Sequence, residues 1–293
     1  MVDTYEGLVI AHLGQGLAVE YQGKTILCQS LRKIGVAAVG DQVRWEQTSP
    51  DQGRVLEILP RRSVLNRPGH NGKTRPVAAN IDKILVVFAL QPECDFLLID
   101  QYLAICENRN IDAELVFNKV DQFDQLDTQE IEQQLEIYKQ NNYPIHYVSA
   151  ETGQGLDQLK QTLRQNICML AGQSGVGKSS LTNALIPDKH LKTNTLSEAS
   201  GHGRHTTTAA TLYHLPDGGA LIDSPGVAIF GLAGISEVQL AQGYREFQPL
   251  IEQCRFNNCR HLQDKGCAVR SAVEANTISK ERYQRFLKLR EKM

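Results

Sequence analysis

The segment Gly172-Gln-Ser-Gly-Val-Gly-Lys-Ser179 most strongly restricts what this chain can fold into. It matches the phosphate-binding pattern G-x-x-x-x-G-K-[ST] in full. An apolar stretch at residues 167–171 precedes it and a helical stretch begins near Lys178, which is the strand–loop–helix context that the pattern requires. Glycines let backbone N–H groups turn towards phosphates, and the start of a helix adds partial positive charge. The sequence therefore predicts an α/β domain that binds a nucleotide.

Two side chains of this loop have predicted roles beyond the backbone. We expect Lys178 to reach the β- and γ-phosphates and Ser179 to place its hydroxyl on Mg²⁺. The predicted phosphate-contacting set is Gly172, Gln173, Ser174, Gly175, Val176, Gly177, Lys178, Ser179 and Ser180.

A second motif, Asn118-Lys-Val-Asp121, distinguishes guanine from adenine. It ends an expected strand at residues 113–117 and resembles the N-K-x-D motif of guanine-nucleotide-binding proteins. The Asp121 carboxylate can accept hydrogen bonds from guanine N1–H and from its exocyclic amine, a donor pair that adenine lacks. We expect Lys119 to cover the ring, Asn118 to tie loops together and the Ala150 N–H to meet guanine O6. The predicted base-contacting set is Asn118, Lys119, Val120, Asp121, Ser149 and Ala150.

A third motif, Asp223-Ser-Pro-Gly226, follows an expected strand and matches D-x-x-G. We expect Asp223 near Mg²⁺ and the Gly226 N–H at the γ-phosphate. Three threonines at positions 206–208 lie between this motif and the phosphate loop, and Thr207 is our choice as the Mg²⁺-binding switch residue.

The order of these motifs is unusual. N-K-x-D and Ser149-Ala150 precede the phosphate loop, whereas they follow it in an ordinary small GTPase. The chain is therefore expected to be circularly permuted. Alternating strand-like and helix-like stretches between residues 84 and 222 agree with a mostly parallel sheet covered by helices.

The segments that flank this region differ from it in charge and in pattern. Residues 1–75 carry a net charge of +3, residues 76–235 carry −9 and residues 236–293 carry +4. Short alternating runs at residues 7–12, 17–21, 25–29, 42–48 and 54–59 predict a five-stranded barrel of the OB type. Such a barrel commonly binds RNA, although a purely structural barrel would have the same pattern. The cations that follow it suit either a solvated joint or a phosphate-contacting arm: Arg61, Arg62, Arg67, Lys73 and Arg75.

The C-terminal segment carries a cluster of soft ligands, Cys254-x₄-Cys259-x-His261-x₅-Cys267. Three thiolates and one imidazole are a usual set for a structural zinc ion, and the alternative is a chance group of buried thiols. Nearby cations suit RNA phosphates: Arg255, Arg260, Lys265 and Arg270. A final helix at residues 279–292 is expected to dock on this segment by an apolar stripe, with RNA contact by its basic face as the alternative.

Composition excludes several other classes of protein. Hydrophobic residues make up 41% and charged residues 22%, which is ordinary for a globular chain and excludes a disordered or fibrous one. No apolar run is long enough for a membrane helix and no secretory signal is visible, so we expect a cytoplasmic protein without membrane contact. Nothing in the sequence indicates an oligomer, and a monomer is the default expectation.

The permuted order, the barrel and the Cys/His cluster together resemble the RsgA (YjeQ) family, circularly permuted GTPases of bacterial small-ribosomal-subunit assembly. The resemblance rests most on the phosphate loop, on Gly203-Arg-His-Thr-Thr-Thr and on Asp223-Ser-Pro-Gly-Val. It implies a zinc knuckle at the Cys/His cluster and a water-positioning role for His205. Val227 stands where many GTPases carry a catalytic glutamine, so slow intrinsic hydrolysis is expected. The predicted catalytic set is His205, Lys178 and Thr207.

The expected architecture is a circularly permuted α/β P-loop GTPase domain, flanked by an N-terminal OB-fold β-barrel and a C-terminal helical zinc-binding domain. The expected boundaries are residues 1–62 for the RNA-binding barrel, 63–80 for a basic linker, 81–235 for the GTPase domain and 236–293 for the zinc-knuckle domain. The expected function is RNA-stimulated GTP hydrolysis on the maturing small ribosomal subunit, with Zn²⁺ and Mg²⁺ as cofactors. Two alternatives stay open: a regulatory GTPase acting on a protein partner, and an RNA-binding protein with GTP as a static ligand.

Overall fold

The structure is a computed structural model that describes residues 3–14, 16–68, 74–125, 127–187, 210–224, 232 and 234–293. The chain forms two compact units, and each unit is assembled from separate segments of the sequence. The first unit comprises residues 1–83, 156–170 and 178–230, and the second comprises residues 84–155, 171–177 and 231–293. In the described part of the chain, no helix is both long and apolar enough to cross a membrane.

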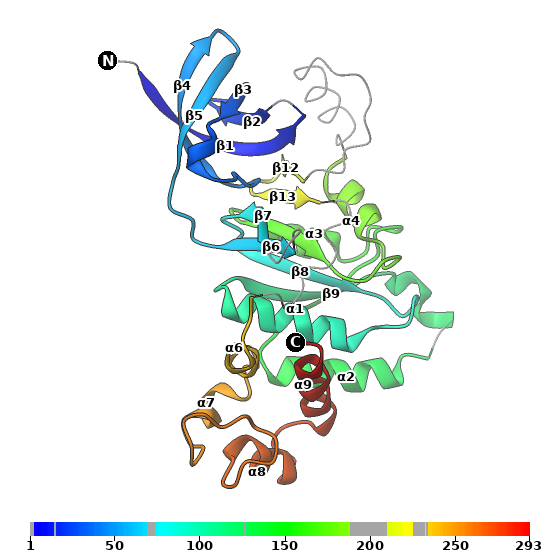
Figure 1. The fold of residues 1–293 in the computed structure, drawn as a ribbon. Helices are drawn as coiled ribbons and strands as arrows, with labels where there is room; N and C mark the ends of the chain where they lie inside the picture. The colour runs from blue at the N-terminus through cyan, green and yellow to red at the C-terminus, as the bar shows by residue number, and fades with distance from the viewer. Residues whose placement is uncertain are drawn as a thin grey trace. The chain divides into compact units, whose positions relative to one another are not determined.

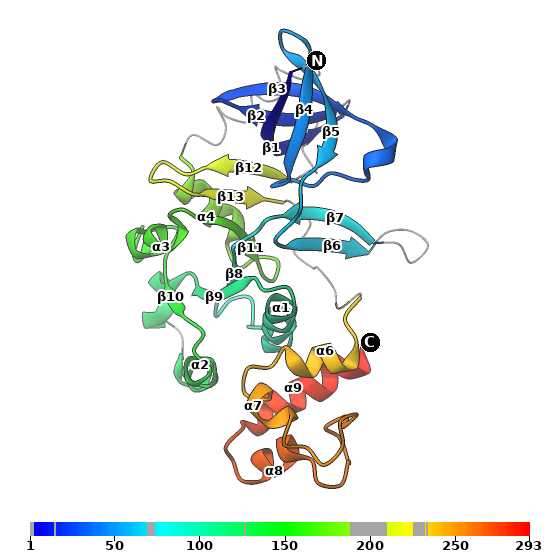
Figure 2. The same ribbon diagram turned by 90° about the vertical axis from the view of Figure 1, so that its left-hand side faces the viewer.

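Five strands at the N-terminus of the first unit curl around one another into a small barrel (Figure 2). They are β1 (Thr4–Leu13), β2 (Gly16–Tyr21), β3 (Lys24–Ser30), β4 (Gln42–Ser49) and β5 (Gln52–Ile58). The strand order is β1-β2-β3-β5-β4, and pairing between β1 and β4 closes the barrel. A parallel β3–β5 pair is the one exception among these otherwise antiparallel pairings. The five-stranded barrel expected from the alternating sequence is thus confirmed.

Alternation of apolar and polar residues fills the interior of this barrel. Its core includes Val9, Val19 and Val43 packed around Trp45, whose side chain is 1% exposed. The large indole fits because Gly53 lies against it: a Cβ at Gly53 would stand 2.6 Å from a ring carbon of Trp45. The barrel therefore stabilises itself through its own apolar core.

The segment expected to be a basic linker contains regular structure. Strands β6 (Val64–Pro68) and β7 (Thr74–Ala79) pair antiparallel, and Val39 forms an isolated bridge to Ala78. The two arginines that precede β6 are held by acids: Arg61 pairs with Asp41 at 2.7 Å and Arg62 with Asp82 at 2.5 Å. These two arginines are thus paired with acids, whereas the choice between a solvated joint and a phosphate-contacting arm stays open for the other cations of this segment. Arg67 and Arg75 are exposed and directly opposite each other in the hairpin.

The first unit also contains α3 (Leu156–Leu163), β11 (Ile167–Ala171), α4 (Lys178–Leu185), β12 (Thr211–His214) and β13 (Ala220–Asp223). The order β11-β13-β12 leads directly into the barrel because β12 pairs with β1. A surface pair between His214 and Glu20, at 2.9 Å, lies across the same junction. Figure 1 shows β12 and β13 next to the barrel strands.

The second unit has three further strands, in the order β10-β9-β8, and the helices that accompany them. The strands are β8 (Lys83–Phe88), β9 (Asp112–Phe117) and β10 (Ile145–Tyr147). Residues 84–88 are completely or almost completely buried, as expected for a continuous apolar run in a strand covered on both faces. Helix α1 (Phe96–Asn108) packs on β9, and α2 (Gln129–Gln140) precedes β10.

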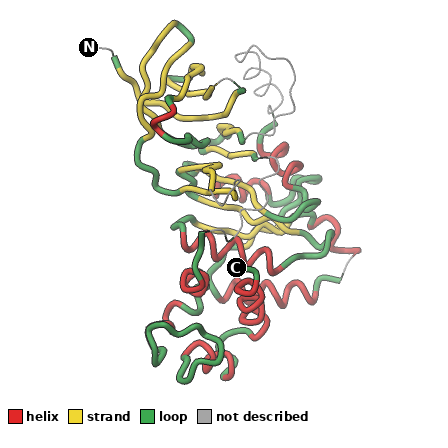
Figure 3. Tube along the Cα trace, viewed as in Figure 1, coloured by secondary structure: helices red, strands yellow, loops and turns green. Residues whose placement is uncertain are grey.

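Helices, drawn in red in Figure 3, form much of the C-terminal part of the second unit. They are α6 (Glu237–Gln242), α7 (Gln248–Ile251), α8 (Ala268–Glu274) and α9 (Lys280–Glu291). Helix α1 contacts both α6 and α9, so the C-terminal helices share a core with the α/β strands of this unit. The expected fold class is confirmed: an α/β core, an N-terminal five-stranded barrel and a C-terminal helical segment with a Cys/His cluster.

Candidate functional site

The phosphate loop begins where β11 ends, and two of its glycines are required by close packing. Gly172 has a φ of 136°, and a Cβ on it would stand 2.0 Å from the carbonyl oxygen of Val87. Gly177 has a φ of 94°, and a Cβ on it would stand 2.3 Å from the Asn118 side-chain amide. Any larger residue would therefore push the loop away from its supports.

Asn118 connects the phosphate loop with the Ser149-Ala150 loop. Its side chain is 1% exposed. The Asn118 amide nitrogen donates to the carbonyl oxygen of Val176 at 2.9 Å. Its Oδ1 accepts from the Ala150 N–H at 3.2 Å. One buried amide thus positions two loops that are far apart in the sequence, a role that a shorter or apolar side chain could not perform.

The other residues of the N-K-x-D motif are also held in place. Lys119 has a positive φ of 66°, and its Nζ donates to the carbonyl oxygens of Gln91 and Gly175, each at 2.8 Å. The exposed Asp121 accepts a 2.5 Å hydrogen bond from the buried Ser149 hydroxyl. That hydroxyl fixes the direction of the carboxylate that we expect to face guanine. The Ala150 N–H, expected to face guanine O6, donates to Asn118 in this structure.

The remaining predicted residues at the phosphate end belong to the first unit or lie outside the described residues. Lys178 and Ser179 begin α4, and burial lowers the pKa of the half-buried Lys178 amine. Asp223 is the last residue of β13. His205, Thr207 and Gly226 lie outside the described residues, so their predicted roles have no structural test here.

Helix α1 contributes a contact that the sequence motifs do not reveal. The Asp95 carboxylate caps α1 by accepting from the Leu98 N–H at 3.0 Å. The Asp95 N–H in turn lies 3.4 Å from Oε1 of Gln173 in the phosphate loop. An acid directly before an apolar helical run is a capping signal, but its link to the loop depends on tertiary structure.

The four predicted metal ligands converge in the C-terminal part of the second unit. The donor atoms of Cys254, Cys259, His261 and Cys267 all lie within 4.8 Å of one another. Nδ1 of His261 is 3.7 Å from Cys254 Sγ and 3.5 Å from Cys267 Sγ. A tetrahedral zinc ion with ordinary bond lengths requires S···N edges of about 3.5 Å and S···S edges of about 3.8 Å. The two S···N distances are close to this requirement, and the widest donor separation, 4.8 Å, would have to shorten by about 1 Å around one tetrahedral ion.

The surroundings of the cluster favour a bound cation. The Tyr283 hydroxyl donates to the His261 carbonyl oxygen at 2.6 Å and fixes that residue in its left-handed backbone conformation. Burial raises the pKa of the Cys259 thiol to about 12. Three sulfurs held this close together are stable as thiolates only when a cation neutralises them.

The basic residues of α9 do not form the free face that the sequence allows. Arg282 is 1% exposed and pairs with Asp100 at 2.5 Å and with Glu246 at 2.5 Å. Arg285 also pairs with Asp100, at 2.6 Å, and the mostly buried Arg290 pairs with Glu237 at 2.5 Å. The alternative of RNA contact by this basic face is wrong for these three residues, because they anchor the helix.

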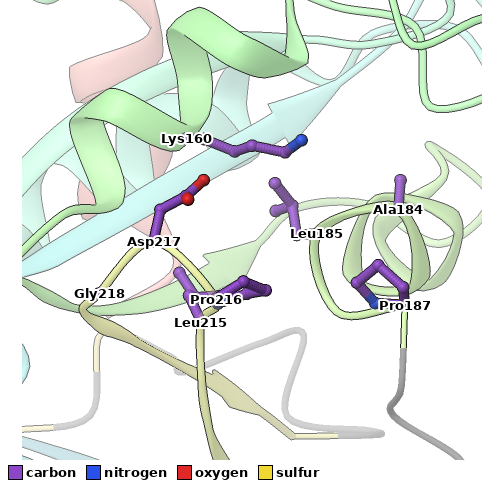
Figure 4. A pocket seen from close by; sticks show the side chains of 8 residues that line it. All are labelled: Lys160, Ala184, Leu185, Pro187, Leu215, Pro216, Asp217 and Gly218. Carbon is purple, nitrogen blue, oxygen red and sulfur yellow. The ribbon is translucent and has the colours of Figure 1, made fainter.

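A small pocket in the first unit lies apart from these motifs (Figure 4). It has a volume of about 90 Å³ and lies at the end of α4, beside α3 and the turn between β12 and β13. None of the residues predicted to bind nucleotide or metal lines it. Its lining residues are Lys160, Ala184, Leu185, Pro187, Leu215, Pro216, Asp217 and Gly218.

Comparison with known proteins identifies one family. Residues 58–233 match the family model described as RsgA GTPase. The chain is 42% identical over 296 residues to the small ribosomal subunit biogenesis GTPase RsgA of Haemophilus influenzae (strain PittEE), covering 99% of this chain and 86% of the relative. It is 41% identical over 292 residues to the protein of the same name from Actinobacillus pleuropneumoniae serotype 5b, covering 98% of this chain and 85% of that relative.

Two solved structures resemble the whole chain. The crystal structure of YjeQ from Thermotoga maritima superposes with a TM-score of 0.81 at 31% identity, covering 99% of this chain and 98% of the other. The structure of YloQ, described as a circularly permuted GTPase, superposes with a TM-score of 0.76 at 26% identity, covering 99% and 95%. The likeness spans the barrel, the α/β strands and the C-terminal helices.

Proposed function

Because the chain belongs to the RsgA GTPase family, we propose that it hydrolyses GTP in the late assembly of the small ribosomal subunit. The observation that carries the proposal is the junction at Asn118, where one buried side chain joins the phosphate loop to the Ser149-Ala150 loop. A guanine-specific site needs these loops in one place, and they come together although the motif order is permuted. The relatives named for this process extend the proposal to the subunit and its rRNA as partners.

The guanine end of the proposed site is formed by Asp121 and its neighbours. The Ser149 hydroxyl satisfies one lone pair of the Asp121 carboxylate and leaves the remaining lone pairs for the two guanine donors. Lys119, anchored by two carbonyl oxygens, covers the base. Adenine lacks this pair of donors, so discrimination against ATP is expected to be strong.

At the phosphate end we assign the loop from Gly172 to Ser180 to GTP and GDP. Ser179 and Thr207 would hold Mg²⁺, which neutralises charge on the β- and γ-phosphates when bound. Lys178 would add a second positive charge, and Gly226 a backbone donor. His205 would position water, because Val227 occupies the position of the usual glutamine. We therefore propose slow intrinsic hydrolysis that a partner stimulates.

We assign the Cys/His cluster to one structural zinc ion. Its four donors come from a segment with little core of its own, so ion binding would contribute directly to folding. Around it, and on the β6–β7 hairpin, lie cations that RNA phosphates could contact. Arg67 and Arg75 are the clearest pair, because like charges directly opposite in a hairpin favour an anion between them. We propose that the protein acts as a monomer in the cytoplasm.

The test is GTP turnover by the purified protein, alone and with small ribosomal subunits, at low and moderate salt. Stimulation that weakens as salt rises is the expected result, because phosphate contacts release counterions. The variant Lys178→Ala should abolish turnover while leaving subunit binding measurable. Absence of turnover under every condition would favour GTP as a static ligand. Turnover without any subunit binding in the GTP state would favour a protein partner instead.

A further inference from the structure

The loop between the first two metal ligands exposes an aromatic side chain that the core does not use. Phe256 lies two residues after Cys254 and is 47% exposed. The rings of Phe247, Tyr283 and Phe286 contact one another in the core of the C-terminal helices, and Phe256 is not among them. Single exposed apolar side chains are ordinary on protein surfaces, but this ring is also fixed in position beside a cation.

Phe256 is held in a defined position. Its carbonyl oxygen accepts from the Cys259 N–H at 3.1 Å, which makes residues 256–259 a tight turn between two ligands. The Arg255 N–H donates to the Gly266 carbonyl oxygen at 3.0 Å and ties this turn to the other side of the cluster. The ring is therefore presented on a rigid support, which limits the entropy lost when it binds something.

Arg255 lies beside the exposed ring. Its guanidinium carbon is 5.4 Å from the Phe256 ring centroid, within the range of a cation–π contact. The Arg255 side chain passes close over Gly266: a Cβ at that glycine would stand 2.9 Å from Cβ of Arg255. A larger residue at Gly266 would displace the arginine. The ring and the guanidinium thus form one preorganised surface.

Charge around this surface is positive. The segment from Cys254 to Cys267 contains Arg255, Arg260 and Lys265 but only one acid, Asp264. Arg260 pairs with Glu237 of α6 at 3.3 Å, so these three cations and two acids leave a net charge of +1. Oδ2 of the half-buried Asp264 carboxylate accepts from the Arg260 and Leu262 N–H groups at 3.2 Å each. Asn257 and Asn258 are exposed at the turn and offer amides for hydrogen bonds.

We propose that Phe256 stacks on an unpaired base of RNA while Arg255 contacts the adjoining phosphate. Each part of the surface matches one part of a single-stranded nucleotide: the ring matches the base face, the guanidinium the phosphate and the asparagines the base edge. Paired RNA hides its base faces in the stack, so the surface selects looped or single-stranded segments. This inference rests on the proposed function and adds the class of RNA feature that the metal-binding segment recognises.

The test uses the full-length, zinc-loaded protein with two probes: a fluorescein-labelled single-stranded RNA of about twelve nucleotides, and small ribosomal subunits. We expect Phe256→Ala to weaken single-stranded RNA binding by roughly 5- to 100-fold, the usual range for loss of one stacked base. Phe256→Leu should weaken it similarly, whereas Phe256→Trp should preserve it. Val238→Ala is the matched control, because Val238 is also exposed, at 60%, on α6. Zinc content and basal GTP turnover should be equal in all four variants.

Two further measurements separate stacking from other contacts. Replacing the probe bases by abasic sites should remove the difference between wild type and Phe256→Ala. The slope of affinity against salt should be the same for both proteins, because the phosphate contacts are unchanged. RNA and subunit binding that is unaffected in both Phe256→Ala and Phe256→Leu would overturn this inference alone. If Phe256→Leu still binds the subunit and Phe256→Ala does not, the ring makes an apolar contact with a protein, which would overturn stacking on a base. Failure of the wild type to bind either probe would refute the proposed function as well.

Discussion

Asp100 on α1 is the single residue whose replacement should most clearly loosen the C-terminal helix. Its side chain is fully buried and accepts from Arg282 at 2.5 Å, Arg285 at 2.6 Å and the Tyr138 hydroxyl at 2.5 Å. Burial lowers the pKa of Arg282, but the charges of Asp100 and Glu246 more than offset this and keep the guanidinium charged. Asp100→Asn would leave that buried cation with one carboxylate instead of two.

The expected cost follows from the burial. Removing one partner of a buried, hydrogen-bonded ion pair costs about 3–5 kcal/mol, whereas an exposed pair contributes less than about 1 kcal/mol. Because Arg282 keeps Glu246, at 2.5 Å, we expect Asp100→Asn to cost about 3 kcal/mol, at the lower end of this range. Lys288→Ala is the control, since Lys288 is exposed on the same helix and should change stability by less than about 0.5 kcal/mol.

The assay is urea unfolding followed by circular dichroism, with amide hydrogen exchange to locate the change. Lost stability should be concentrated in α9 and in the part of α1 that faces it. The double variant Asp100→Asn/Arg285→Gln should cost less than the sum of the single variants, because the two side chains share one contact. A cost below about 1 kcal/mol for Asp100→Asn, or loss of protection spread evenly over the chain, would refute the view that these ion pairs anchor the helix.

Three other predictions concern the guanine site, the metal and acid stability. Asp121→Asn removes the proposed acceptor of two guanine donors and should weaken GTP binding by at least about 100-fold, with a gain for xanthosine triphosphate, both measured by nucleotide titration. Equal affinity of the variant and the wild type for GTP would remove Asp121 from the proposed site. Cys259→Ser should abolish stoichiometric zinc binding and the hydrogen-exchange protection of residues 254–267, whereas α9 should stay protected by its ion pairs. Loss of protection in α9 together with residues 254–267 would show that the metal anchors the helix. The hydrogen bond from Arg290 lowers the pKa of Glu237 in the folded protein. The contribution of Glu237 to the free energy of unfolding is therefore fully present above the unfolded pKa of about 4.5 and is lost as the pH falls through the lower folded pKa. Glu237→Gln should therefore flatten the fall in stability on the acid side, and an unchanged profile would contradict this.

The sequence predicted most of the fold because its apolar periodicity is local. Residues 167–171 coincide with β11, and the helical stretch expected from Lys178 becomes α4. The β6–β7 hairpin was missed because arginines, prolines and glycines dominate that segment and indicate a loop. The Asn71-Gly72 pair is a recognised hairpin-turn signal and could have identified it.

The contacts that anchor α9 could not be predicted in the same way. Helical periodicity shows that α9 has arginines, but not which acids meet them. Asp100 is 182 residues away from Arg282 in the sequence, and Glu246 is 36 residues away. Only tertiary structure brings them together, so a face that looks solvated in the sequence becomes a buried network. The four Cys/His side chains of the cluster, in contrast, lie within fourteen residues of one another, so their spacing already indicated a candidate metal site.

Helix α1 is shared by the phosphate loop and the C-terminal helices. At its first turn, Asp95 contacts Gln173 of the loop, and one and a half turns later Asp100 holds two arginines of α9. A helix of this length is stiff, so a displacement at its start is carried to the residues that hold α9. Asp100→Asn is therefore expected to reduce subunit-stimulated GTP turnover more than basal turnover. An equal loss of both rates would place the effect in the nucleotide site itself and contradict a connection through α1.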